Sequence, residues 1–250
     1  DGTHVEQTIG YHIQVLYEYL AAITSMRSSG LEPPNDWLSA VSNMASFLSN
    51  IIRPDGTPPM IGDTALHDPQ TPYAHDVLGC AAHILGRPEL LVAKSNLGLK
   101  AINLIGLDSF IWDTSPSQII PTKESKIFKD GGYCILRGKE ADHQIYAVFD
   151  CGPFSMDGNP GHGHADALSF EFAAYGKNLI IDPGVFTYEP GKWRNYFSGT
   201  SAHNTIVVDG KDQILRWGAF RVYKPSGSKL LSWRTEKQIV LADASFQAQD

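Results

Sequence analysis

Two histidines and an aspartate stand at alternate positions in the segment that spans residues 160–168. In an extended chain His162, His164 and Asp166 would share one face, so their side chains could converge on one spot. Imidazole and carboxylate groups in this pattern can hold zinc, or they can act as a catalytic acid and base. The motif alone leaves both chemistries open, together with a third interpretation, in which the histidines are structural.

Two later segments could add ligands to this motif. Asp182 follows an apolar run, and His203 stands directly before a segment that is expected to form a strand. Two histidines and one carboxylate from separate strands form a ligand set typical of zinc. The spacing also resembles that of metallo-β-lactamase-like hydrolases, but these place a histidine where this sequence has Ala167, which disfavours hydrolysis.

Helices are expected to position the amino-terminal side of the site. Apolar residues recur at helical spacing over residues 5–26, and the pattern predicts further helices over about 35–52, 73–86 and 89–98. The loop at 58–72 is long, and long loops between helices often carry functional residues.

The periodicity changes to two after a stretch at 115–125 that is rich in Ser, Pro and Thr. Short alternating runs, separated by turn dipeptides such as Asp130-Gly131, predict an antiparallel β-sandwich, with Thr205 and Val207 on one of its strands. We therefore expect a helical domain at 1–122 and a sandwich domain at 123–250. Each half looks incomplete as a closed domain, so we expect an excerpt of a longer chain.

Composition excludes several classes of function. The 250 residues are 42% hydrophobic and 19% charged, which is typical of a globular protein, and the net charge is −7 without a run of Lys or Arg. These features argue against nucleic-acid binding. No stretch approaches the roughly 18 apolar residues of a membrane span, so membrane insertion is not expected. Three cysteines without paired spacing predict small buried side chains rather than a disulfide framework.

A family resemblance rests on several elements in fixed order. The carboxyl-terminal half contains GHGHADALSFEFAAYGKNLIIDPGVFTY from Gly161, then WRNYF, then SAHNTIVVDGKDQ. This order resembles the signature of the heparinase II/III-like polysaccharide lyases. The amino-terminal half contains DGTHVEQ and DGTPPMIGD, which resemble the active-site helix start and cleft loop of the family. The resemblance implies an incomplete α/α toroid followed by an antiparallel β-sandwich.

The resemblance also implies a reaction, namely β-elimination beside a uronic acid in a polysaccharide, and it implies catalytic residues. His162 matches the catalytic base or its partner, and His4 the residue that neutralises the uronate carboxylate. The cleft loop lacks the tyrosine that relatives usually carry, so Tyr73 and Tyr11 are the local candidates. Tyr188 matches a cleft tyrosine on the sandwich.

The remaining expectations concern binding. The resemblance implies substrate contacts from Glu6, Gln7, Arg194, Asn195 and Tyr196. It also implies a structural zinc at His164, Asp182 and His203, which would brace the loop that presents His162, while Asp166 could orient an imidazole.

The implied partner is an acidic polysaccharide, and such a polymer suggests a periplasmic or secreted protein. Oligomeric state stays open. The missing loop tyrosine motivates an alternative, in which the protein is a catalytically impaired member that binds glycans or takes part in exopolysaccharide biosynthesis.

Overall fold

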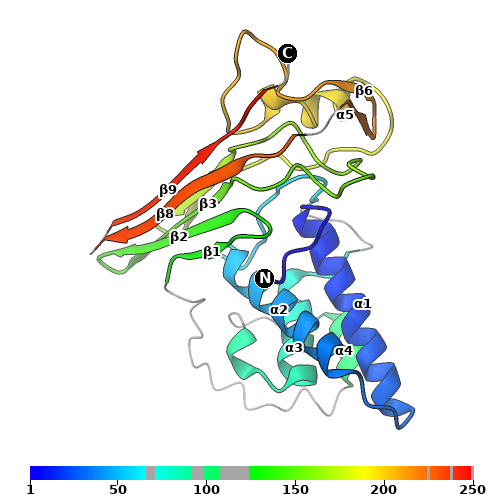
Figure 1. The fold of residues 1–250 in the computed structure, drawn as a ribbon. Coiled ribbons are helices and arrows are strands. Elements are labelled where there is room, and N and C mark those ends of the chain that lie inside the picture. The colour runs from blue at the N-terminus through cyan, green and yellow to red at the C-terminus, as the bar shows by residue number, and fades with distance from the viewer. Residues whose placement is uncertain (66–70, 92–97, 107–123, 224–225, 237–238, 249–250) are drawn as a thin grey trace.

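Helices come first along the chain and antiparallel strands follow them (Figure 1). The computed structural model describes residues 1–65, 71–91, 98–106, 124–223, 226–236 and 239–248. This order of elements confirms the expected fold class. The domain boundary expected at residue 122 lies outside the described residues.

The helices of the amino-terminal half are built from amphipathic segments. They are α1 (Ile9–Ser28), α2 (Asn35–Ile51), α3 (Ala74–Leu85) and α4 (Leu99–Ile105). One stripe of α1 is buried, because its apolar residues recur every three or four positions: Ile9, Ile13, Leu16, Leu20 and Ile23. Among the described residues, none of the helices is both long and apolar enough to cross a membrane.

The structure describes only the two ends of the helix predicted over residues 89–98, and neither end is α-helical. A single 3₁₀ turn occupies η1 (Pro88–Leu90), and Leu91 leaves the helical region with ψ 120°. Residues 92–97 lie outside the described part, and α4 begins only after Gly98. The backbone N–H of Gly98 donates to the Asp76 carboxylate, which fixes the start of α4 against α3.

The central sheet has five antiparallel strands in the order β1-β2-β3-β4-β5. Because each strand pairs with the next along the chain, the sheet is a simple meander. Two hairpins, β6-β7 and β8-β9, follow it along the chain. The strands are β1 (Lys126–Phe128), β2 (Tyr133–Glu140), β3 (His143–Asp150), β4 (Phe170–Ala174), β5 (Lys177–Ile180), β6 (Arg216–Gly218), β7 (Arg221–Val222), β8 (Lys229–Glu236) and β9 (Ile239–Ser245).

Two segments that were expected to be extended strands are loops. The segment with Thr205 and Val207 forms only an isolated bridge between Val208 and Lys211, and its apolar side chains are largely exposed. The His162–Asp166 segment contains a turn rather than a strand. Both segments have alternating polarity, but no strand within the described residues pairs with either of them.

One apolar core joins the two halves of the chain. Phe47 of α2 packs against Phe128 and Tyr133 of the sheet, with ring centroids 4.9 and 5.5 Å apart. Directly after α2, Arg53 forms a buried ion pair with Glu171 of β4 at 2.7 Å. The junction between the halves is thus fixed by both apolar packing and charge.

Candidate active site

Asp63 lies at the centre of a polar group where the two halves meet. Its Oδ2 lies 2.9 Å from Nδ1 of His162, and its Oδ1 lies 2.8 Å from Nε2 of His164. The Arg194 guanidinium donates to both carboxylate oxygens, at 2.9 Å for Nη2. Asp63 comes from the loop after α2, whereas its three partners come from the strand half.

Two tyrosines flank His162 on its exposed side. The ring of Tyr11, on α1, lies 4.4 Å from the His162 ring, and the Tyr188 ring lies 6.4 Å away. The two tyrosine hydroxyl oxygens are 3.5 Å apart. His162 keeps 24% of its side-chain surface exposed, so solvent or a ligand can reach an imidazole that already stands beside two hydroxyls.

The electrostatic environment sets the proton states of this group. Burial raises the pKa of Tyr188, and its hydrogen bond with Tyr11 raises that pKa further; burial also raises the pKa of Tyr11. Burial alone would raise the pKa of Asp63, but hydrogen bonds from His162, His164 and Arg194 hold it well below its usual value. At neutral pH the site therefore holds two protonated tyrosines and one ionised carboxylate.

The amino-terminal segment carries three of the predicted residues, His4, Glu6 and Gln7. Glu6 acts electrostatically on both His4 and Tyr11, which places it near both of them. Burial lowers the pKa of His4, and the Glu6 charge opposes this shift. Gln7 is 8% exposed and lines a small cavity together with His164.

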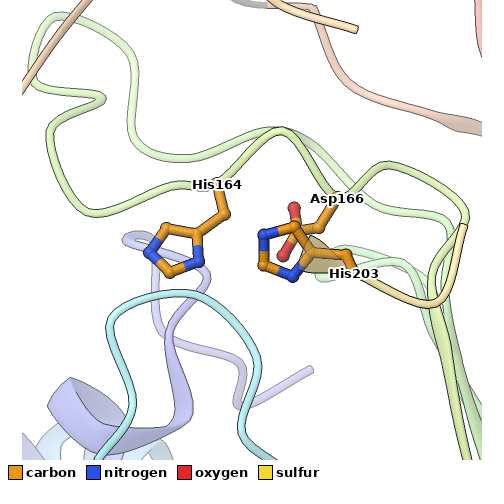
Figure 2. A group of neighbouring side chains, drawn as sticks. All are labelled: His164, Asp166 and His203. Carbon is orange, nitrogen blue, oxygen red and sulfur yellow. The ribbon is translucent and has the colours of Figure 1, made fainter. Parts of the chain in front are cut away.

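A second cluster adjoins Asp63 through His164, and Figure 2 shows its side chains. His164, Asp166 and His203 are all buried, and one potential ligand atom from each lies within 4.8 Å of the others. The two imidazole rings are tilted by 44° to each other, with centroids 5.2 Å apart. Nδ1 of His164 and Nε2 of His203 are buried and have no hydrogen-bond partner among the described residues. Such orphaned imidazole nitrogens fit a metal ion, which takes the free lone pair of each.

Asp182 and Asp166, the two carboxylates near this cluster, make different contacts. Asp182, which was expected as a ligand, accepts a hydrogen bond at 2.7 Å from Nδ1 of His203, and its other oxygen accepts from Gly184 N–H. Burial would lower the pKa of His203, but Asp182 outweighs this effect and raises it. Asp166 instead offers the carboxylate oxygen that groups with the two histidines. The predicted ligand set with Asp182 stays a prediction.

The other residues expected to be functional differ in their burial and in their contacts. Arg194 is 1% exposed, so its charge is committed to Asp63 rather than to an open cleft. Asn195 lines a separate surface hollow of about 1160 Å³ beside β6. Tyr196 is exposed and packs on Trp193 and Phe197. Tyr73 is exposed and stacks on His75, and no described contact joins it to His162.

The sequence did not single out Asp63 as a site residue. It is one acid in a loop that is rich in Pro, Gly and Asp, and its three partners are about 100 or more residues away along the chain. The available signal was its place directly after Met60-Ile61-Gly62, an inward-packing apolar segment. Gly62 adopts φ +60°, and a Cβ there would lie 2.7 Å from the Thr8 side chain, so the loop can approach closely only with glycine.

Comparison with known protein families agrees with this architecture. The family model for the heparinase II/III-like C-terminal domain matches residues 120–246, and the model for the heparinase II/III N-terminus matches residues 1–75. Solved structures share the fold across the whole chain: a heparinase III superposes with a TM-score of 0.74 at 22% identity, and the chain covers 35% of it. The heparan sulfate lyase HepC from Pedobacter heparinus gives a TM-score of 0.72 at 21% identity, again with 35% of its length covered.

Two curated relatives match most of this chain. A heparin-sulfate lyase of Pedobacter heparinus is 25% identical over 223 residues, which cover 86% of this chain and 30% of that enzyme. One from Bacteroides stercoris is 23% identical over 91% of this chain and 32% of its own length. The chain thus spans about a third of the length of the curated relatives it matches. With both of its halves matched by family models, the chain belongs to the heparinase II/III-like family.

Proposed function

We propose that the full-length protein is a polysaccharide lyase that cleaves a uronate-containing polysaccharide by β-elimination. The observation that carries this proposal is the group of His162, Tyr11 and Tyr188 beside the buried Asp63. β-Elimination needs a base for the proton on C5, an acid for the departing oxygen on C4, and a partner for the adjacent carboxylate. An imidazole and two hydroxyls side by side can supply the first two.

In this mechanism His162 takes the C5 proton. The electron pair of the C5–H bond forms the C4–C5 double bond, and the bond from C4 to the glycosidic oxygen breaks. Tyr188 protonates that oxygen, because its raised pKa keeps the hydroxyl protonated until charge develops on the leaving group. Tyr11, whose hydroxyl lies beside that of Tyr188, then passes a proton from solvent to Tyr188, and His162 releases the C5 proton to solvent from its partly exposed ring.

Neutralisation of the uronate carboxylate falls to His4 in this scheme. Burial favours its uncharged form, which can still donate one hydrogen bond to a carboxylate. Nδ1 of His4 is buried and has no hydrogen-bond partner among the described residues. Glu6 stands nearby and would orient the ring.

The substrate class we propose is an acidic glycosaminoglycan of the heparin or heparan sulfate type. Support comes from the curated relatives, which are heparin-sulfate lyases. The test is to incubate the full-length protein with heparan sulfate, heparin, chondroitin sulfate and alginate, and to follow the ultraviolet absorbance of the unsaturated uronate product. Product from heparan sulfate supports both the reaction and the class. Product from alginate alone would overturn the class, and no product from any of these glycans would overturn the reaction.

A second candidate is a glycan-binding member that has lost turnover. The observation in its favour is the cleft loop, where Met60 and Ile61 are buried and supply no hydroxyl. This candidate predicts that heparan sulfate binds without cleavage and that His162→Ala leaves the affinity unchanged. Turnover by the wild-type protein excludes it.

We further propose that His164 and His203 hold a structural zinc ion with one carboxylate, from Asp166 or from the expected Asp182. The orphaned buried nitrogens support this proposal. Bound zinc would brace the loop that carries His162, and the elimination itself consumes no water for a metal to activate. Metal analysis of Asp166→Asn and Asp182→Asn variants separates the two ligand sets. Export to the periplasm or beyond is also proposed, because the substrate is an extracellular polymer.

A further inference from the structure

Two histidines contact one carboxylate through different ring nitrogens. His162 meets Asp63 with Nδ1 at 2.9 Å, whereas His164 meets it with Nε2 at 2.8 Å. An ionised carboxylate accepts hydrogen bonds and cannot donate them, so the contacted nitrogen of each ring has to carry the proton. In a neutral imidazole the other nitrogen then carries a free lone pair.

The surroundings of Asp63 hold its carboxylate in one orientation, and this orientation determines the proton positions on the two histidines. Its side chain has no exposed surface, and Arg194 donates hydrogen bonds to both of its oxygens. Its backbone N–H donates to the His162 carbonyl at 3.2 Å, which ties the two loops together. Neither the carboxylate nor the His162 backbone can therefore rotate away independently.

We propose that Asp63 is the positioning residue that sets which ring nitrogen each histidine presents. His162 offers an unprotonated Nε2 on its exposed side, and His164 offers an unprotonated Nδ1 to the cluster with Asp166 and His203. The part that concerns His162 as a base rests on the proposed function. The part that concerns proton position rests only on geometry, since Nδ1 of His164 is buried and has no partner among the described residues.

This assignment matters because a base needs a lone pair at the reacting atom. With the proton on Nε2, His162 would point an N–H at the substrate and could not take the C5 proton. In serine proteases, an Asp-to-Asn change that puts the catalytic histidine in the wrong tautomer lowers kcat by about 10⁴-fold. In this protein one carboxylate would set the proton position in two imidazoles. His162 would be protonated on Nδ1 and His164 on Nε2.

The direct test is nitrogen NMR of the full-length protein with ¹⁵N-labelled histidine, at neutral pH and without added metal. His162→Gln and His164→Gln spectra assign the two rings. We expect the wild-type protein to carry the proton on Nδ1 of His162 and on Nε2 of His164. Asp63→Asn should change the protonated nitrogen of at least one of these rings and leave the other histidines unchanged. A wild-type His162 protonated on Nε2 would overturn the inference, as would unchanged tautomers in folded Asp63→Asn protein.

A matched control comes from the same loop. Asp55 is exposed and accepts hydrogen bonds from Thr57 and Asn178. Asp55→Asn removes one carboxylate from the loop but should leave both histidine spectra as in the wild type. If Asp63→Asn fails to fold because Arg194 is left unpaired, the wild-type spectrum alone still decides the proton positions.

Kinetics then test the consequence for catalysis. Asp63→Asn should lower kcat by roughly 10²- to 10⁴-fold with little change in KM, because it alters the base and not the substrate contacts. The Asp63→Asn, His162→Gln double variant should be no slower than His162→Gln alone, whereas additive losses would contradict action through His162. If the wild-type protein cleaves no glycan, the proposed function fails, while the spectra still decide this inference.

Discussion

At the scale of single residues, His162 is the group whose removal should separate catalysis from folding. Its ring is partly exposed and contacts Tyr11, so His162→Ala removes little core packing. We expect kcat on heparan sulfate to fall about 10²- to 10⁴-fold, as for loss of a general base, with an unchanged melting temperature. Steady-state kinetics and thermal unfolding check both parts. His143→Ala, at an exposed position on β3, is the control and should leave kcat unchanged.

The two tyrosines beside His162 should differ in their contribution. Tyr188→Phe removes the proposed acid and should lower kcat about 10²-fold or more, because the leaving oxygen would depart without its proton. Tyr11→Phe removes only the neighbouring hydroxyl and should cost less. Kinetics with a substrate that carries an activated leaving group provide the readout, since such a substrate should rescue Tyr188→Phe selectively. The assignment would be reversed if the rescue favoured Tyr11→Phe.

The sequence predicted one side of this site better than the other. His162 and Tyr188 lie within a dense motif of about fifty residues, so their proximity followed from family resemblance. Tyr11 was only an alternative to Tyr73, because nothing local distinguishes a helix face that meets His162 from one that does not. Asp63 was missed, since its role depends on contacts between loops that are far apart in the chain.

At the scale of elements, the loop after α2 is held by one buried ion pair. Arg53 donates to both oxygens of Glu171, at 2.8 and 2.7 Å, and Glu171 also accepts the backbone N–H of Met60 and that of Asp182. Glu171 therefore links the start of the Asp63 loop to the segment after β5. The position of Asp63 depends on this anchor.

Loss of this anchor should cost much more stability than loss of a surface pair. Arg53→Met leaves the Glu171 charge buried without its cation, and we expect the free energy of unfolding to fall by about 3–5 kcal/mol. Urea denaturation followed by circular dichroism measures the change. Lys139→Met breaks an exposed pair with Asp142 and should match the wild type. Equal stability of both variants would show that the buried pair does not anchor the loop.

Helices and strands were predicted correctly where the apolar face of the segment packs against another element. The prediction failed where the apolar face has no such packing partner. The periodicity of α1 and α2 was sufficient, because their apolar stripes are buried in the shared core. The segment at 205–207 has the composition of a strand, yet Ile206 is 68% exposed and no strand in the described part of the chain pairs with it. Sequence alone reports the tendency to pair but not the presence of a neighbour.

At the scale of the whole molecule, the site exists only because two differently built halves meet. The helical half supplies Asp63 and Tyr11, and the strand half supplies His162, Tyr188 and Arg194. The shared apolar core and the Arg53–Glu171 pair hold these contributions in register. A substitution that destabilises either half near the junction should therefore alter the geometry of the site. The proposed zinc ion would stabilise the site from the strand half.

Zinc should stabilise the folded protein by binding at His164 and His203. A ligand that binds only the folded state at about 100 times its Kd raises the free energy of unfolding by about 2.7 kcal/mol, so chelation should lower the melting temperature of protein as purified. His203→Asn should abolish this response, because it removes a buried nitrogen that nothing else in the described part satisfies. His143→Asn, at an exposed position, should retain it. Calorimetry with and without zinc measures all three proteins, and an equal zinc response in the His203→Asn variant would place the metal elsewhere.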